Sequence, residues 1–308
     1  MFDELHHADW STAASKRWIA TARRTPAGWV ASGPRPVGPS LALLQDLVSA
    51  ARSRRVLAGF DFPIGLPASY GILTGFQTFL EALPALGRAA GWEGALEVCS
   101  RPDEVSVRRP FYPRTATKGV SRTALTEGIG VGTFGELLRQ CERGGPGLRA
   151  ACSVFWTLGG NQVGRAAISG WRELIRPALE QGAALWPFDG DLQSLNRRDG
   201  LVLAETYPAD GYAVAGASFS SRESKTSQSD RRSKAASILK WAALAAVDIE
   251  DAKEALADGF GSGRNGEDQF DALIGLLAMI AVVDEHRPEA TVKTAPEIAA
   301  WEGWILGR

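Results

Sequence analysis

Five acidic residues stand where predicted strands end or where the last predicted helix begins: Asp9, Asp61, Glu205, Asp268 and Asp271. One buried carboxylate at such a place is costly unless a cation or a hydrogen-bond donor pairs with it. Several together form the oxygen-only ligand set that suits Mg²⁺ or Mn²⁺. Two such ions, ~4 Å apart, catalyse in-line phosphoryl displacement, because one activates the attacking water and the other stabilises the leaving oxygen. The acids therefore predict a catalytic carboxylate cluster, provided that the fold brings them together.

Each acid also has an ordinary structural explanation. Asp9 would N-cap a helix or start an Asx turn, and Asp268 would be a first-turn helix acid. Asp61 would accept hydrogen bonds from turn amides near residues 63–65, and Glu205 would pair with a surface arginine. What favours a shared site is the order of the acids along the chain, because no single one of them is specific.

Hydrophobic periodicity predicts an α/β protein whose elements could position these acids. Strands are expected over residues 5–8, 17–22, 28–32 and 201–207, and in the apolar run that carries Asp61. Helices are expected over residues 40–53, 233–247, 251–258 and 268–283, with Ser40 as the N-cap of the first. The order is therefore β-β-β-α-β, followed later by one more strand and the three remaining helices.

The last predicted helix has small residues on the face that carries its acids. Positions three and four residues apart share one face of a helix, and Gly275 and Ala278 continue the face of Asp268 and Asp271. A helix with small residues there can lie close to a sheet. We therefore expect it to press Asp271, and with it Asp268, against the ends of the strands.

Composition limits the class of protein. The 308 residues carry a net charge of −1, which gives no general attraction to nucleic acid or to anionic membranes. Three cysteines without a CxxC pair and three scattered histidines argue against a zinc site or a disulfide framework. The N-terminus has no apolar signal core, and no apolar run reaches ~18 residues. We expect a cytoplasmic protein that has no membrane partner.

Residues 68–198 differ from the rest of the chain, since they are rich in Gly, Arg and Pro. They predict a large, mostly helical inserted subdomain, with the core formed by residues 1–67 and 199–308. Two basic segments are candidate substrate-binding sites, one inside this insertion and one at residues 218–241. Their candidate residues are Arg108, Arg109, Arg114 and Lys118 in the first, and Arg231, Arg232 and Lys234 in the second.

Both basic segments have a chemistry that suits phosphate. In the first, Phe111 and Tyr112 are interleaved with the basic residues, which suits single-stranded nucleic acid or a nucleotide. The second is Ser-rich and predicts a mobile loop over residues 218–234 that would contact phosphate. A structural role for the first segment and a solvated loop for the second are the alternatives.

Five motifs together resemble the uncharacterised bacterial family of predicted RNase H-like nucleases. They are Asp9-Trp10-Ser11 with Trp18-Ile19-Ala20, Gly59-Phe60-Asp61-Phe62-Pro63-Ile64-Gly65-Leu66-Pro67, Ala204-Glu205-Thr206-Tyr207-Pro208-Ala209, Gly266-Glu267-Asp268-Gln269-Phe270-Asp271-Ala272-Leu273 and Glu302-Gly303-Trp304-Ile305-Leu306. The resemblance implies a ribonuclease H-like mixed sheet flanked by helices. It implies that Asp9, Asp61 and Asp271 bind two Mg²⁺ or Mn²⁺ ions, while Glu205 or Asp268 completes the site or orients the attacking water.

The chain departs from the family pattern in its polar first strand, with His6 and His7, and in its large insertion. Two alternatives to a nuclease therefore stay open. One is an ATP-dependent phosphotransferase of the actin and sugar-kinase branch, although the stretch from Asp9 to Thr12 lacks the glycine that its phosphate hairpin needs. The other is a non-catalytic binding protein that retains the fold, because a fold does not fix a function.

Overall fold

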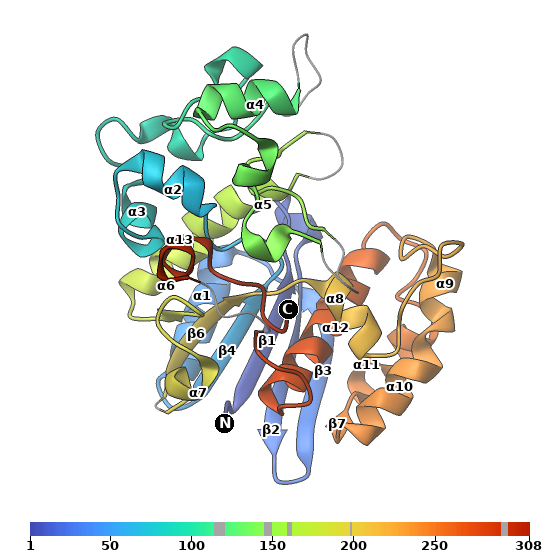
Figure 1. Ribbon diagram of the computed structural model, residues 1–308. Coiled ribbons are helices and arrows are strands. Elements are labelled where there is room, and N and C mark those ends of the chain that lie inside the picture. Colours follow the sequence, from blue (N-terminus) through green and yellow to red (C-terminus); the bar gives the residue numbers. More distant parts are fainter. Residues whose placement is uncertain (114–120, 145–149, 159–161, 198, 291–294) are drawn as a thin grey trace. The chain divides into compact units, whose positions relative to one another are not determined.

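The computed structural model describes residues 1–113, 121–144, 150–158, 162–197, 199–290 and 295–308 (Figure 1). Its contacts divide the chain into two compact units. Unit 1 consists of Met1–Asp61, Pro177–Thr291 and Ile305–Arg308, and unit 2 of Phe62–Arg176 and Val292–Trp304. The second unit thus covers most of the predicted insertion, but it also takes in a segment near the C-terminus.

Unit 1 is built on a seven-stranded mixed sheet, in the order β5-β6-β4-β1-β2-β3-β7. The strands are β1 (Glu4–Asp9), β2 (Trp18–Thr25), β3 (Gly28–Pro36), β4 (Arg55–Phe60), β5 (Ala184–Leu185), β6 (Gly200–Glu205) and β7 (Val247–Asp248). The first three form an antiparallel meander, whereas β4 is parallel to β1, β6 to β4, β5 to β6 and β7 to β3. The α/β class and the five longer strands were predicted. The two-residue edge strands β5 and β7 were not, because two residues show no periodicity.

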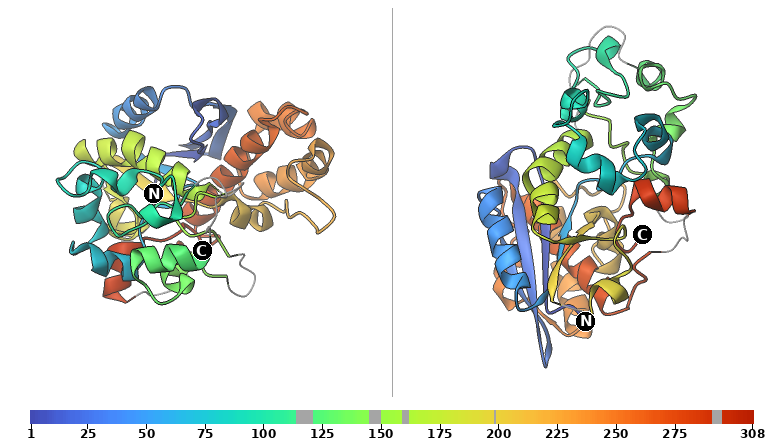
Figure 2. Two further views of the ribbon diagram at one scale, coloured as in Figure 1. Left: turned by 90° about the horizontal axis from the view of Figure 1, so that it is seen from above. Right: turned by 90° about the vertical axis from the view of Figure 1, so that its left-hand side faces the viewer.

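Helices cover both faces of this sheet (Figure 2). Helix α1 (Ser40–Ala51) contacts β4 and β6, and α12 (Gly266–Val283) crosses β1, β2, β3 and β4 on the other face. The prediction that Ser40 is an N-cap is wrong. Pro39 holds that position, and the Ser40 hydroxyl accepts a hydrogen bond from Arg17 Nη1 at 2.7 Å, which ties α1 to the start of β2.

Helix α12 approaches β1 closely because Gly275 has no side chain. A Cβ atom at this position would lie 2.0 Å from Cε1 of His7. His7 is fully buried, and its Nδ1 and Nε2 bond the Ala272 carbonyl and the Thr206 hydroxyl at 3.0 and 2.9 Å. Burial lowers the pKa of His7 to about 4, so the ring is neutral and can donate one of these bonds and accept the other. Both ring nitrogens of His7, in the polar first strand, are therefore satisfied inside the core.

Further helices complete unit 1. They are α7 (Leu192–Leu195), α8 (Pro208–Val214), α9 (Gln228–Ser233), α10 (Ala235–Leu244), α11 (Glu250–Ala257) and the 3₁₀ turn η1 (Ala14–Lys16). Helix α8 packs on α12, α11 on β3 and α10 on β7. The predicted loop over residues 218–234 is partly helical, because α9 begins after Ser227, whose hydroxyl accepts from the Asp230 amide.

Unit 2 is helical. Its elements are α2 (Ala68–Thr74), α3 (Phe79–Ala85), α4 (Arg122–Ile129), α5 (Val163–Gly170), the π-helical turn Trp171–Ile175, α13 (Pro296–Glu302) and the 3₁₀ turns Glu93–Leu96, Pro102–Glu104, Phe134–Leu137 and Gln140–Glu142. Helix α6 (Arg176–Glu180) continues the π turn along the chain. None of the helices in the described part of the chain is long and apolar enough to span a bilayer.

Glu302 explains why a C-terminal segment belongs to unit 2. Its buried carboxylate accepts hydrogen bonds from the amides of Ala68 and Gln140, at 3.2 and 2.5 Å. Its carbonyl accepts from Nη1 of Arg139, which also forms a buried ion pair with Glu142 at 2.9 Å. Glu302, a single residue late in the sequence, thus fixes two distant segments of this unit.

Candidate functional site

The fold brings four of the five predicted acids to one end of the sheet in unit 1. Asp9 is the last residue of β1, and Asp61 directly follows β4. Because β1 and β4 are parallel neighbours, both acids leave the sheet at the same edge. Asp268 and Asp271 lie in the first turns of α12, which crosses β1, and their charges act on Asp9.

The backbone at this edge fixes Asp61 against β1. The amide of Asp61 donates to the Ala8 carbonyl at 3.4 Å, and the amide of Trp10 donates to Asp61 Oδ1 at 2.6 Å. The Trp10 ring packs edge-on against Phe60, and the guanidinium of Arg17 lies 4.0 Å from its centre. The Asp61 carboxylate is therefore held from the neighbouring strand.

The carboxylates are difficult to ionise together. Burial, followed by the charges of Asp61, Asp271 and Asp268, raises the pKa of Asp9 well above its usual range. Burial also raises the pKa of Asp61 to about 7, although the Trp10 amide opposes the shift. The hydrogen bond between the two side chains raises the pKa of Asp9 and lowers that of Asp61. Such a group of mutually repelling acids favours a cation.

Asp271 already has a cation and a donor as partners. Its side chain is nearly buried; Tyr212 donates its hydroxyl to Oδ1, and Lys225 Nζ lies 2.5 Å from Oδ2. Lys225 also pairs with Glu267 at 2.9 Å. Burial alone would lower the pKa of Lys225, but the two acids outweigh it and raise it, so the lysine is charged. The pKa of Asp271 is still raised, because burial exceeds the help from Lys225.

Asp268 has an unsatisfied oxygen. Its Oδ2 is buried and has no hydrogen-bond partner among the residues that the structure describes. Burial raises the pKa of Asp268 to about 6, and the positive charge of Lys16 opposes this shift. The N-cap residue of α12, Asn265, makes no side-chain capping bond either. The oxygens of a capping acid accept hydrogen bonds from backbone amides. A buried oxygen without a donor is instead what is expected of a cation ligand.

Glu205, the fifth predicted acid, is oriented differently from the other four. It pairs in register with Phe60 of β4, while the next residue, Thr206, reaches His7 and the Cβ position of Gly59 on the side of α12. Neighbouring residues of a strand point to opposite faces, so Glu205 faces away from α12. Its backbone instead bridges to Ile305 and accepts from the Leu306 amide at 2.9 Å.

Most of the predicted substrate-binding residues have structural partners. In unit 2, Arg108 stacks 3.8 Å from the Trp92 ring centre, and Arg109 forms an ion pair with Glu104 at 3.1 Å. Arg114 and Lys118 lie outside the described residues.

The predicted substrate-binding residues of unit 1 are also engaged. Arg232 pairs with Asp258 at 3.2 Å, Lys234 pairs with Glu223 at 2.6 Å, and Arg231 is buried against backbone carbonyls. Sequence reasoning did not distinguish such engaged cations from available ones.

The oxygen ligands of the aspartates are of the type that Mg²⁺ or Mn²⁺ prefers, but they are not arranged around one metal position. In the described part of the chain, no three His, Cys, Asp or Glu side chains are arranged to hold a metal ion. The acids nevertheless offer only oxygen ligands, one of them the unsatisfied Oδ2 of Asp268. Both oxygens of Asp271 are taken by Tyr212 and Lys225. A metal ion would therefore have to displace the Lys225 ammonium from Asp271.

Tyr212 and Lys225 are the site residues that sequence analysis missed. Lys225 stands in a basic segment where nothing in the local sequence separates it from Arg222 or Arg232. Tyr212 follows the motif at Glu205 by seven positions, on the face of α8 that meets α12. A signal for either would have required knowledge of which helix packs beside Asp271.

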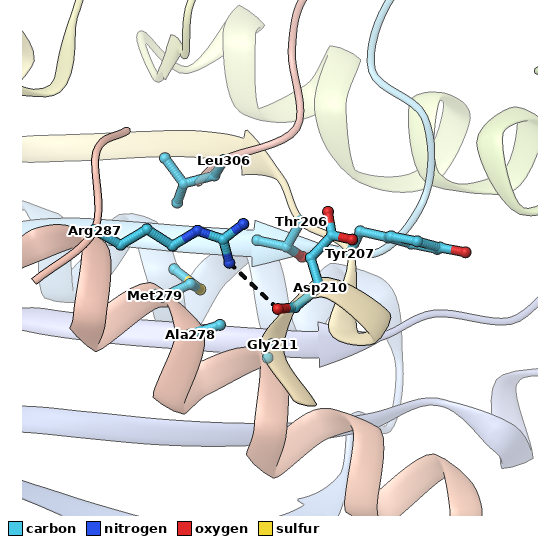
Figure 3. A pocket seen from close by; sticks show the side chains of 9 residues that line it. Thr206, Tyr207, Asp210, Gly211, Ala278, Met279, Arg287 and Leu306 are labelled. Atoms are coloured by element: carbon cyan, nitrogen blue, oxygen red, sulfur yellow. Dashed lines mark hydrogen bonds between the residues drawn. The ribbon is translucent and has the colours of Figure 1, made fainter. Parts of the chain in front are cut away.

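A small cavity on the same face of the sheet is not a substrate site. Figure 3 shows its lining, in which the Arg287 side chain runs between Leu306 and Met279 and its guanidinium points toward Thr206 and Asp210. Arg287 Nη1 donates to the Asp210 carbonyl at 3.3 Å. The free volume is about 10 Å³, room for one water molecule and for no metabolite.

Comparisons with known proteins add no relative to this picture. No protein-family model matches the chain, and no curated protein and no solved structure matches it either. The geometry of the aspartates, of Tyr212 and of Lys225 is therefore what a functional conclusion has to rest on.

Proposed function

We propose that this protein is a Mg²⁺- or Mn²⁺-dependent phosphodiesterase, a nuclease with a ribonuclease H-like core. The observation that carries the proposal is the meeting of Asp9, Asp61, Asp268 and Asp271 in one electrostatically coupled group. The core strands support it, since β1, β2 and β3 are antiparallel, β4 is parallel to β1 and β6 is parallel to β4, which makes a mixed sheet of the kind that the resemblance implies.

In this proposal Asp9, Asp61 and Asp271 hold the metal ions, and Asp268 completes the site or orients the attacking water. The bound ions would supply a hydroxide at neutral pH and charge stabilisation for the leaving oxygen. The chain contributes rigidity. The Trp10 amide fixes Asp61, and the Tyr212 hydroxyl fixes Asp271, so that two acids from distant segments keep their orientation.

Mn²⁺ binding is the first test, followed by hydrolysis of single- and double-stranded DNA and of RNA. Calorimetry should detect Mn²⁺ binding to the wild type and its loss in Asp61→Asn, while Asp46→Asn, an exposed acid on α1, should bind as the wild type does. Metal-dependent cleavage of at least one substrate should follow the same pattern. A wild type that neither binds Mn²⁺ nor cleaves any of these substrates would refute the proposal.

One observation favours a second candidate, a non-catalytic protein that retains the fold. The Lys225 ammonium stands against Asp271 and Glu267, where it neutralises acids without any metal. In a metal enzyme, Lys225→Met should strengthen Mn²⁺ binding, because the competing cation is gone, whereas Lys253→Met on α11 should not. In the non-catalytic protein, Lys225→Met should lower the stability and create no Mn²⁺ binding.

The phosphotransferase alternative receives no such support. The connection from β1 to β2 runs from Trp10 to Arg17 without a glycine, and it is held by Arg17, which donates to the Ser11 carbonyl at 2.5 Å. ATP binding by the purified protein would revive this alternative.

A further inference from the structure

Beside the aspartates lies a second, larger pocket, formed entirely by unit 1. It measures about 470 Å³, within the range of small-molecule sites. Its lining comes from three places: Lys16 at the end of η1, Thr226 and Arg231 before and in α9, and Ser262–Arg264 with Glu267 at the start of α12. The three segments are far apart in sequence, so the pocket is a product of the fold.

The lining is cationic. Lys16, Arg231 and Arg264 face a single acid, Glu267. Glu267 is itself paired with Lys225 at 2.9 Å. Lys16 and Arg264 are exposed, and neither side chain forms a hydrogen bond or an ion pair with any residue in the described ranges. Two cations in one pocket therefore keep their charge available for an anion.

Arg231 adds a buried positive charge that no carboxylate pairs within the described part of the chain. The residue is 1% exposed, and its Nε, Nη1 and Nη2 donate to the carbonyls of Gly259, Lys225 and Gly261 at 2.6–2.8 Å. A guanidinium has five N–H donors, so two remain after these bonds. Burial lowers its pKa, which reports the cost of keeping the charge there, although Glu267 and Asp271 act against the shift. An anion in the pocket would offset that cost.

The loop whose carbonyls bond Arg231 has an unusual backbone conformation. Gly259, Phe260 and Gly261 all have positive φ angles of 68°, 59° and 76°, which turn the two glycine carbonyls toward Arg231. A non-glycine residue rarely adopts this conformation, and it persists only where the surrounding structure enforces it. Phe260 is buried against Phe270 of α12, which fixes the loop beside the helix start.

The pocket adjoins the aspartates directly. Glu267 lines it and shares Lys225 with Asp271. The charge of Lys16 acts on Asp268, and Thr226 follows Lys225 in the chain. An anion bound here would lie next to the group that is proposed to cleave a phosphodiester. The amides at the uncapped start of α12 would add to its attraction.

We propose that this pocket binds a phosphate group of the substrate, adjacent to the phosphate that the aspartates act on, with Lys16 and Arg264 as its available cations and Arg231 as its buried one. That the phosphate belongs to a substrate rests on the proposed function. The pocket itself is independent of the metal and can be tested without it.

The test is anisotropy of a fluorescein-labelled, 5′-phosphorylated DNA octamer, measured in EDTA so that no hydrolysis intervenes. Lys16→Ala and Arg264→Ala should each weaken binding by about fivefold at low salt and make the salt slope less steep by about 0.7, the value for one contact to a single strand. Lys16→Arg should restore binding. The charge-matched double variant Arg52→Ala/Lys253→Ala, at exposed sites, should bind like the wild type.

The source of the phosphate is decided by a second octamer with a 5′-hydroxyl. Equal affinities assign the pocket to an internal phosphodiester, and a preference for the phosphorylated octamer assigns it to a terminal phosphate; both support the proposal. Wild-type affinity in Lys16→Ala/Arg264→Ala would overturn it.

The two proposals fail separately. Mn²⁺-dependent cleavage together with unchanged octamer binding in the double variant would remove the pocket and leave the nuclease. Pocket-dependent binding without metal binding or cleavage would leave the pocket and remove the nuclease.

Discussion

At the scale of single residues, the Asp9–Asp61 pair makes the stability of the fold depend on pH. Both acids have raised pKa values in the fold because burial disfavours their charged forms, and the charge of Asp61 raises the pKa of Asp9 further. The folded protein therefore binds more protons than the unfolded chain between about pH 4 and the raised values. The stability that these protons supply is present at low pH and is lost as the pH rises through that range.

Asp61→Asn should remove part of this loss. The pKa of Asp61 lies at about 7 in the fold. At about pH 8, where the wild type carries the unfavourable charge, the metal-free variant should have a free energy of unfolding larger by a few kcal/mol; at about pH 4 it should match the wild type. Urea unfolding in EDTA at the two pH values measures the difference. Asp46→Asn serves as the exposed control, and a variant that is no more stable than the wild type at the higher pH would contradict the assignment.

At the scale of elements, α12 delivers two aspartates to the site because its small residues allow close packing. Gly275 lies against the His7 ring, and Gly211 of α8 lies against Ile274 and Ala278, where an added Cβ would come within 3.0 Å of both side chains. The helix is thus clamped between β1 and α8. Its position along β1 decides where Asp271 points.

Gly275→Ala should displace this helix. The new methyl group would overlap the His7 ring, and the fully buried ring has no space to yield. We expect a loss of about 3 kcal/mol of stability, together with weaker Mn²⁺ binding. Thermal unfolding and calorimetry measure the two effects. Gly135→Ala is the matched control, because its added Cβ would meet only ordinary contacts at 3.7 Å; equal losses in the two variants would argue against the clamp.

Much of this element-level picture was accessible from the sequence. The periodic run of α12, its small face at Gly275 and Ala278, and the strands before Asp61 and Glu205 all follow from local pattern. Two kinds of feature did not. The side of the sheet that Glu205 faces depends on its register with Phe60, and the roles of Lys225 and Arg231 depend on which segments the fold places beside α12. Register and long-range pairing leave no mark on the neighbouring residues.

At the scale of the whole molecule, unit 2 depends on a segment that is synthesised well after the rest of that unit. The Glu302 carboxylate is 4% exposed and accepts amide hydrogen bonds from Ala68 and Gln140. Glu302→Ala would leave both amides without these bonds. Removing a buried charged acceptor in this way should cost about 3 kcal/mol.

Limited proteolysis locates that effect. Glu302→Ala should speed cleavage within residues 62–176 and leave the sheet of unit 1 protected. Glu297 is exposed and lies five positions earlier on α13, so the protease should cleave Glu297→Ala at the wild-type rate. Uniform acceleration across both units would show that Glu302 does not act on unit 2 alone.

The hydrogen bond between His7 and Ala272 joins residues that are 265 positions apart. The ribosome therefore releases β1, β4 and the Phe62–Arg176 part of unit 2 before α12 exists, and Asp9 and Asp61 precede Asp271 by most of the synthesis. Chains whose contacts span such distances fold slowly, because loop closure must precede the contacts that reward it. A nascent chain therefore cannot assemble the full set of aspartates early, and any activity that needs them begins only after α12 has left the ribosome.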